Sequence, residues 1–248
     1  TATMQYRVLA ELKKCLPQDA MITDEERARV YECDGLSGYR QLPACVLLPE
    51  TVEQVQAILR ICYREKIPVV ARGAGTGLSG GALPVQDGVV LGLAKFNRIL
   101  DINPLQRSAR VQSGVVNISI SEAVACHGLY YAPDPSSQIA CTIGGNVAEN
   151  AGGVHCLKYG LTVHNILALK MVTAEGDVLE IGSEALDTAG YDLSALLTGS
   201  EGMLGIIVEV TVRLLPRPPF SRVLLASFAE IEAAGRGVAD IIANGIVP

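Results

Sequence analysis

The chain has 248 residues but no tryptophan, few aromatic residues and no Cys-x-x-Cys pair among its seven cysteines. An odd number of scattered cysteines predicts neither a disulfide framework nor a zinc ribbon, and it suits a reducing compartment. The three histidines, His127, His155 and His164, lack the spacing of metal ligands, so we expect no metal site. Acidic residues outnumber basic residues by 26 to 20, which argues against a nucleic-acid partner.

Long apolar runs are also lacking. Runs such as Ala44 to Leu48 fall far short of the about 18 residues that a membrane-spanning helix needs, so we expect no transmembrane segment. Residues 1–14 have no apolar core of the kind found in secretory signals, and they predict a short amphipathic helix. We therefore expect a cytoplasmic protein, and any attachment to the inner membrane would come through partner subunits.

Glycine, in contrast, is in excess, with 25 residues, about 10% of the chain against a usual level of about 7%. Thirteen of these glycines lie within three short segments, at residues 72–81, 144–160 and 199–205. Clustered glycines let the backbone turn its N–H groups toward one point and approach a ligand closely. The glycine excess therefore predicts where the backbone contacts a ligand.

The hydrophobic pattern predicts a mixed α+β chain. Thr51 and Gln54 have the spacing of a capping box, which predicts that a helix begins after Thr51. Strands are predicted around it and further along the chain, at 44–48, 67–71, 88–93, 99–102, 109–112 and 205–215. Residues 118–127 predict a helix that ends at Gly128, and 194–197 a short one. Residues 166–173 and 178–181 predict a hairpin, and the stretch 131–160 reads as mostly loop.

Three prolines at residues 216, 218 and 219 predict a boundary near the C-terminal end. We expect the N-terminal helix and a first α/β subdomain in residues 1–103, and a second α/β subdomain in 104–219. After the prolines, 222–227 predicts a strand and 228–244 a helix. Because neither has a partner in the sequence, we expect 220–248 to be the start of a truncated C-terminal domain.

The first glycine segment, residues 72–81, directly follows a predicted strand. Its glycines can form a backbone nest for a phosphate group, and Thr76 and Ser79 add hydroxyl donors. A flexible loop or a tight packing turn is the alternative interpretation.

Three familiar motifs fit this segment poorly. The run Gly75-x-Gly77-x-x-Gly80 matches the dinucleotide fingerprint by letter, but that fingerprint needs a helix to follow, and Ala82-Leu83-Pro84 follows instead. The missing helix also disfavours a serine hydrolase with Ser79 as its nucleophile. No Gly-Lys-Ser or Gly-Lys-Thr is present, which excludes a Walker A loop.

The second and third glycine segments are also rich in small polar residues. Gly144 and Gly145 permit close approach to a ligand, and Thr142, Asn146 and Asn150 offer donors and acceptors. A long structural loop is the alternative there, although such loops are uncommon in compact domains. In the third segment the Glu201 carboxylate can accept hydrogen bonds from a ribose, whereas a simple turn into the next strand is the alternative.

In this order, the three segments resemble the FAD-binding domain of the vanillyl-alcohol oxidase and p-cresol methylhydroxylase superfamily. Within it, the chain is most similar to the flavin subunit of bacterial glycolate oxidases and to D-lactate and D-2-hydroxyglutarate dehydrogenases. The resemblance covers roughly residues 40–220. It implies an α+β fold of the p-cresol methylhydroxylase (PCMH) type, with two α/β subdomains around FAD and the start of a cap domain after them.

The resemblance also implies the cofactor-binding residues. The pyrophosphate would contact the first segment, at Arg72, Gly73, Ala74, Gly75, Thr76, Gly77, Ser79 and Gly80. The flavin and ribityl chain would contact Pro133, Asp134, Ser137, Thr142, Gly144, Gly145, Asn146, Ala148 and Gly160. The adenosine would contact Glu201, Gly205, Ile206 and Ile207. Some relatives tether FAD to a histidine in the first segment, which has none here, so we expect noncovalent FAD.

The implied function is an FAD-dependent oxidoreductase that oxidises a 2-hydroxy acid, such as glycolate or D-lactate, to the 2-oxo acid by hydride transfer to flavin N5. Relatives carry their basic and metal-binding residues in the cap domain, so we assign no catalytic residue within this chain. The expected partners are the small-molecule substrate and companion electron-transfer subunits. The alternative is a non-catalytic FAD-binding or electron-relay subunit.

Overall fold

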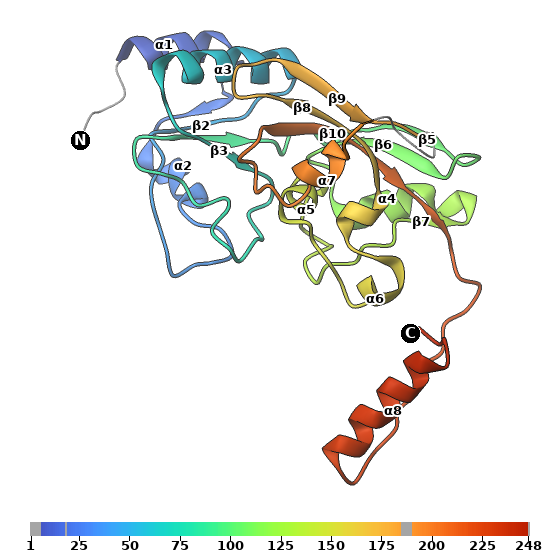
Figure 1. The fold of residues 1–248 in the computed structure, drawn as a ribbon. Helices are drawn as coiled ribbons and strands as arrows, with labels where there is room; N and C mark the ends of the chain where they lie inside the picture. The colour runs from blue at the N-terminus through green and yellow to red at the C-terminus, as the bar shows by residue number, and fades with distance from the viewer. Residues whose placement is uncertain (1–5, 18, 185–189, 248) are drawn as a thin grey trace.

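The computed structural model describes residues 6–17, 19–184 and 190–247. It contains a four-stranded sheet, a five-stranded sheet and a separate two-stranded ribbon. In Figure 1 the N-terminal segments, in blue, gather on one side of the molecule, and the green to orange segments gather on the other. The mixed α+β composition predicted from the sequence is confirmed.

The first sheet has the order β1-β2-β4-β3, formed by Met21–Ile22, Cys45–Leu47, Val89–Gly92 and Val69–Arg72. Strands β2, β4 and β3 are parallel, and helix α3 (Val52–Glu65) connects β2 to β3. The predicted helix start is confirmed, because the Thr51 hydroxyl accepts a hydrogen bond from the Gln54 backbone N–H at 3.3 Å. Lys66, in the left-handed conformation, ends the helix.

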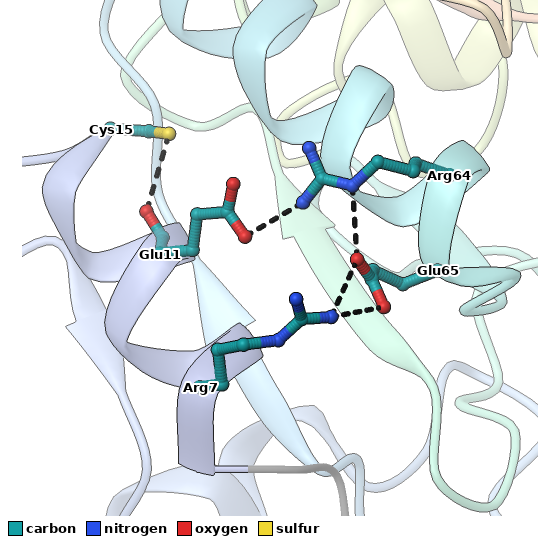
Figure 2. A network of polar contacts seen from close by, with 5 residues as sticks. All are labelled: Arg7, Glu11, Cys15, Arg64 and Glu65. Carbon is teal, nitrogen blue, oxygen red and sulfur yellow. Dashed lines mark hydrogen bonds and ion pairs between the residues drawn. The ribbon is translucent and has the colours of Figure 1, made fainter.

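Helix α1 (Tyr6–Lys14) packs on α3 through the buried side chains of Val8 and Leu12. Charged side chains bridge the two helices at the surface (Figure 2): Arg7 Nη2 lies 3.0 Å from Glu65 Oε2, and Arg64 Nη2 lies 2.7 Å from Glu11 Oε2. Arg64 Nε also lies 2.9 Å from Glu65 Oε1. The N-terminal helix is thereby fixed to the crossover helix of the first sheet.

The second sheet is antiparallel throughout, with the order β5-β6-β10-β8-β9. Its strands are Ile99–Asn103, Ser108–Gln112, Ile206–Arg213, Ile166–Val172 and Val178–Gly182. The predicted hairpin is confirmed as β8 and β9. The sequence places residues 99–102 in the first α/β subdomain, but this strand, β5, pairs with β6 in the second sheet, because the short connection between the two strands lets them pair as a hairpin.

The two sheets are held together by α3 and by a shared core. The hairpin turn of β8 and β9 docks on α3, where Gln56 Nε2 and Arg60 Nη2 donate to the Gly176 carbonyl at 2.7 and 3.0 Å. Val172 and Val208 from the second sheet lie in the same buried cluster as the α3 side chains. Val69 and Ala71 of β3 pack against the same cluster, so the strand from which the glycine loop starts is fixed relative to the second sheet.

Helices cover the second sheet as well, with α4 at Asn117–Val124, α5 at Ile143–Glu149 and α7 at Leu193–Leu197. The predicted helix end at Gly128 is confirmed by its φ of +67°, after a 3₁₀ turn η2 at Ala125–His127. The expectation that 131–160 is mostly loop was wrong for α5. This helix buries Ile143 and Val147 in the hydrophobic cluster that packs on the second sheet. Its two glycines have a low helix propensity, so local sequence preferences do not predict it. The remaining short elements are α2 (Glu25–Ala28), η1 (Arg29–Tyr31), β7 (Leu129–Tyr130), α6 (Cys156–Tyr159), η3 (Thr162–Asn165) and β11 (Leu215–Pro216).

The C-terminal segment extends away from both sheets and ends in α8 (Ile231–Ala243), shown in red in Figure 1. The expected strand at 222–227 was wrong for the described chain, because these residues form no sheet pairing there. Their apolar side chains, such as Leu224 and Leu225, are almost fully exposed. A strand needs a neighbour for its backbone groups, and no described strand is within pairing reach. Among the described helices, none combines the length and apolarity needed to cross a bilayer.

Candidate cofactor site

A cavity of about 470 Å³ lies where the three glycine segments meet. Its walls come from the loop after β3, from α5 and the residues before it, and from the turn that leads into β10. Its volume falls in the usual range for small-molecule sites, about 300–1,000 Å³. Most of the residues predicted from the sequence line it: Arg72, Gly73, Ala74, Gly75, Thr76, Gly77, Ser79, Ser137, Thr142, Gly144, Gly145, Asn146, Ala148, Glu201, Gly205 and Ile207.

Five predicted residues lie outside this lining: Gly80, Pro133, Asp134, Gly160 and Ile206. The Asp134 carboxylate instead pairs with His155, whose Nδ1 lies 2.6 Å from Oδ2. Ile206 faces a second cavity beside the end of α3, because adjacent residues of a strand point to opposite sides. The alternation places Ile207, and not Ile206, at the first cavity.

Sequence reasoning missed several lining residues: Ala71, Leu78, Gly81, Ala82, Leu93, Ser113, Cys141, Glu149, Ala151 and Gly202. Many of these are neighbours of predicted residues within the glycine segments. Ser113 is different, because it follows β6 and reaches the cavity only through the pairing of β6 with β10. Its sequence surroundings contain no signal of a binding site.

The loop after β3 presents an unusual row of free backbone donors. No backbone N–H of residues 73–82 donates a hydrogen bond to any other residue that the structure describes. The β3–β4 ladder ends at Arg72, and β3 is an edge strand, so the sheet does not use these groups. Unpaired N–H groups in a half-buried loop indicate that the loop is built for an acceptor-rich ligand such as a phosphate.

Glycine is required in this loop for close approach and for backbone conformation. A Cβ on Gly73 would lie 2.2 Å from Thr142 Oγ1, so only glycine lets the loop lie against the start of α5. Gly75 has a φ of +71°, which other residues adopt at a cost. The loop and α5 therefore form one continuous wall of the cavity.

Two buried hydroxyl groups at the cavity have no partner. Ser113 Oγ and Thr142 Oγ1 are both inaccessible to solvent and make no hydrogen bond within the described chain. Buried polar groups are normally paired, because an unpaired one costs about 1–3 kcal/mol. The two hydroxyls and the free N–H groups fit a bound group that supplies both phosphate and other polar atoms.

Arg72 supplies the positive charge of the cavity lining. Its Nη1 donates to the Cys33 carbonyl at 2.8 Å, and its guanidinium lies 5.6 Å from the centre of the Tyr31 ring. Burial lowers the pKa of Arg72, and nearby Asp34 opposes that shift. The side chain is thus fixed at the start of the glycine loop, where a cation complements a bound anion.

Two carboxylates flank the same loop. Ser79 Oγ donates to Glu149 Oε2 at 2.8 Å, and Glu149 Oε1 lies 2.8 Å from the point where a Cβ on Gly81 would stand. Glu201 Oε2 lies 3.7 Å from the same point. Arg72, Glu149 and Glu201 are the charged residues of the lining, so the lining carries two acids and one base.

This architecture is the fold of the p-cresol methylhydroxylase (PCMH) type. The fold is similar to alkyldihydroxyacetonephosphate synthase, with a TM-score of 0.84, 22% identity and coverage of 100% of this chain and 51% of that one. It is also similar to p-cresol methylhydroxylase, with a TM-score of 0.74, 23% identity and coverage of 88% and 45%. These likenesses confirm the fold class expected from the sequence.

A protein-family model described as an FAD binding domain matches residues 43–182, more than half of the chain. The chain therefore belongs to the family of FAD binding domains, and FAD is its cofactor. The free N–H groups and hydroxyls of the cavity fit that cofactor.

Curated relatives are similar over nearly the whole chain. Glycolate oxidase subunit GlcD of Escherichia coli (strain K12) is 64% identical over 97% of this chain and 48% of its own length. The protein of the same name from Bacillus subtilis (strain 168) is 44% identical over 88% of this chain and 47% of its own length. D-lactate dehydrogenase of Anaerostipes hadrus is 34% identical over 97% of this chain and 51% of its own length. The chain thus spans about half the length of the curated relatives it matches.

Proposed function

We propose that this chain is the FAD-binding part of an oxidoreductase that oxidises a 2-hydroxy acid, such as glycolate or D-lactate, to the 2-oxo acid. The names of the relatives support this class of substrate. The observation that carries the proposal is the row of unpaired N–H groups at residues 73–82, in a loop most of whose residues line a cavity of suitable size. When bound, FAD supplies the chemistry by accepting a hydride at flavin N5.

Within the cavity we assign each wall to one part of the cofactor. The N–H groups of residues 73–82 would hold the pyrophosphate, with the positive charge of Arg72 close by. Ser113 and Thr142, whose hydroxyls lack partners, would bind the flavin and ribityl side. Glu201 would accept hydrogen bonds from the ribose of the adenosine. The chain's own contribution is to bind and orient the cofactor and to exclude water from its buried side.

We assign the catalytic base to the part of the relatives that this chain does not span. The exposed apolar side chains of Leu224, Leu225 and Phe228 support the view that 220–248 begins a further domain, which would cover them. The word "subunit" in the names of two relatives supports companion electron-transfer subunits.

The test uses the full-length protein, purified with its flavin. We expect anaerobic glycolate, D-lactate or D-2-hydroxyglutarate to bleach the visible flavin absorbance, and the corresponding 2-oxo acid to appear in equal amount. A protein that stays colourless in added FAD would overturn the cofactor assignment. A yellow protein that no 2-hydroxy acid reduces, but that a companion subunit does reduce, would support the electron-relay alternative.

We further propose that the FAD is held without a covalent bond. The glycine loop has no histidine, and the lining thiol, Cys141, is buried. Acid precipitation should therefore release all the flavin into the supernatant. Flavin that stays with the wild-type precipitate but is released from a Cys141→Ser variant would show a thioether tether instead.

A further inference from the structure

The carboxylate of Glu149 occupies an unexpected place for a loop that binds anions. Glu149 lies at the end of α5, and its carboxylate accepts a hydrogen bond from the Ser79 hydroxyl at 2.8 Å. The carboxylate also stands against Gly77 and Gly81. A Cβ on Gly77 would lie 3.3 Å from Glu149 Oε1, so the carboxylate stands against the loop whose N–H groups would bind the pyrophosphate. The Glu149 carboxylate would therefore repel a phosphate bound in this loop.

The charges of the lining do not cancel this repulsion. Arg72 supplies one positive charge to the lining, whereas Glu149 and Glu201 supply two negative charges, so the lining keeps a net negative charge. A loop selected only for the tightest binding of phosphate would not place a carboxylate at this point. The carboxylate does, however, discriminate between ligands, because the repulsion grows with the charge of the phosphate that enters the loop.

We propose that Glu149 is a selectivity residue of the phosphate loop, which favours the internal pyrophosphate of a dinucleotide over nucleotides that end in a phosphate. Each phosphate inside FAD is bonded on both sides, through one ester and one anhydride, and carries one negative charge, whereas a terminal phosphate carries about 1.5 to 2 charges at neutral pH. ADP and inorganic pyrophosphate would thus be penalised more than FAD. This inference rests on the proposed placement of the pyrophosphate in the loop at residues 73–82.

The test compares the full-length protein with Glu149→Gln, which keeps the shape and can still accept the Ser79 hydroxyl. The cofactor is removed, and Kd values are measured for FAD by flavin fluorescence and for ADP and inorganic pyrophosphate by displacement of FAD. We expect Glu149→Gln to bind FAD about threefold and ADP about tenfold more tightly. Both gains should shrink at high salt, because Glu149 faces solvent and its charge is screened.

Glu122→Gln is the matched control, because Glu122 is exposed on α4 and its side chain has no partner in the described structure. Glu149→Ala is a second variant that removes the same charge, and thermal melting checks that each protein is folded. Weaker FAD binding in both Glu149 variants would show that the carboxylate is a cofactor ligand. An equal increase in affinity for FAD and for ADP would show that Glu149 does not discriminate between them. Unfolding of both variants would make it structural. Failure of the wild type to bind FAD would overturn the proposed function itself.

Discussion

Asn146 Nδ2 donates a hydrogen bond to Asn117 Oδ1 at 2.8 Å, and both side chains are buried. Asn117 Nδ2 in turn donates to the Pro133 carbonyl at 3.1 Å. This chain of amides joins α5, α4 and the loop that precedes α5, so it holds the second glycine segment in place against the second sheet. The rigidity of that wall depends on these two buried hydrogen bonds between amide groups and a backbone carbonyl.

Replacing Asn117 by alanine should therefore destabilise the protein and loosen the cavity. The Asn146 amide and the Pro133 carbonyl would lose their partner while buried, which costs about 1–3 kcal/mol. We expect Asn117→Ala to lower the free energy of unfolding by this amount in urea titrations and to weaken FAD binding. The exposed Asn97 is the control, and its alanine variant should stay within about 0.5 kcal/mol of wild type. Equal stability of the two variants would contradict the role of the amide chain.

Gly75 provides a separate test of the glycine loop. A valine there would have to adopt a φ of +71°, and its Cβ would lie 2.3 Å from Arg72 Nη2. The strain amounts to about 1–3 kcal/mol, which most domains tolerate. We expect Gly75→Val to remain folded by circular dichroism but to lose FAD retention.

The control for that variant is Gly38→Val, because a Cβ on Gly38 meets nothing within 4 Å. It should keep both the fold and the flavin. If Gly75→Val instead unfolds while its folded fraction binds FAD as wild type does, the loop is a structural turn and not a phosphate site.

Much of the fold could be predicted because its signals are local. The Thr51 cap and the Gly128 stop each act within one helical turn, and both stand where the sequence places them. The elements that the sequence did not predict depend on packing between residues far apart in the chain. Helix α5 forms despite Gly144 and Gly145 because Ile143 and Val147 gain burial in a core made by distant strands. Tertiary packing here outweighs local propensity.

The same contrast explains the site. Glycine clusters mark close backbone approach directly in the sequence, so the loop at 72–81 was predictable. Ser113 was not, because its relation to the cavity arises only when β6 pairs with β10. Ile206 lies outside the lining because strand alternation sends its side chain to the face opposite that of Ile207. The contact expected for Ile206 is through its backbone, which can meet the edge of a base, and it stays a prediction.

The stability of the folded protein should depend on pH through Glu65, which pairs with Arg64 on α3 and with Arg7 on α1. Hydrogen bonding from Arg64, assisted by the charge of Arg7, lowers the pKa of Glu65 from its ordinary value of 4.5. A lowered pKa in the folded state means that the ionised form stabilises the fold above pH 4.5 and that this stabilisation is lost as the pH falls through the lowered value.

We therefore expect Glu65→Gln to melt at a lower temperature than wild type at pH 7, by a small amount because the pair is near the surface. The difference in Tm should narrow below pH 4.5 and disappear once Glu65 is protonated. Glu26→Gln, at an exposed site on α2 without a side-chain partner in the described structure, should show no such trend. A pH-independent difference would mean that the side chain acts by packing and not by charge.

The unpaired hydroxyl of Ser113 makes the most direct prediction about the cavity. Removing a buried hydroxyl that has no protein partner relieves a desolvation cost, so Ser113→Ala should leave the cofactor-free protein as stable as wild type or slightly more stable. If FAD supplies the missing partner, the same variant should bind FAD about five- to tenfold more weakly, which corresponds to one lost hydrogen bond.

Ser121→Ala should show the opposite pattern. The Ser121 hydroxyl lies outside the cavity lining and is paired at both ends with the Tyr131 backbone, accepting from its N–H at 3.0 Å and donating to its carbonyl at 3.3 Å. Its loss should lower the free energy of unfolding by about 1–3 kcal/mol and leave the Kd for FAD unchanged in the folded protein. Calorimetry of the two variants with and without FAD measures both quantities. A Ser113→Ala variant that loses stability without FAD, yet binds FAD as tightly as wild type, would show that its hydroxyl serves the fold alone.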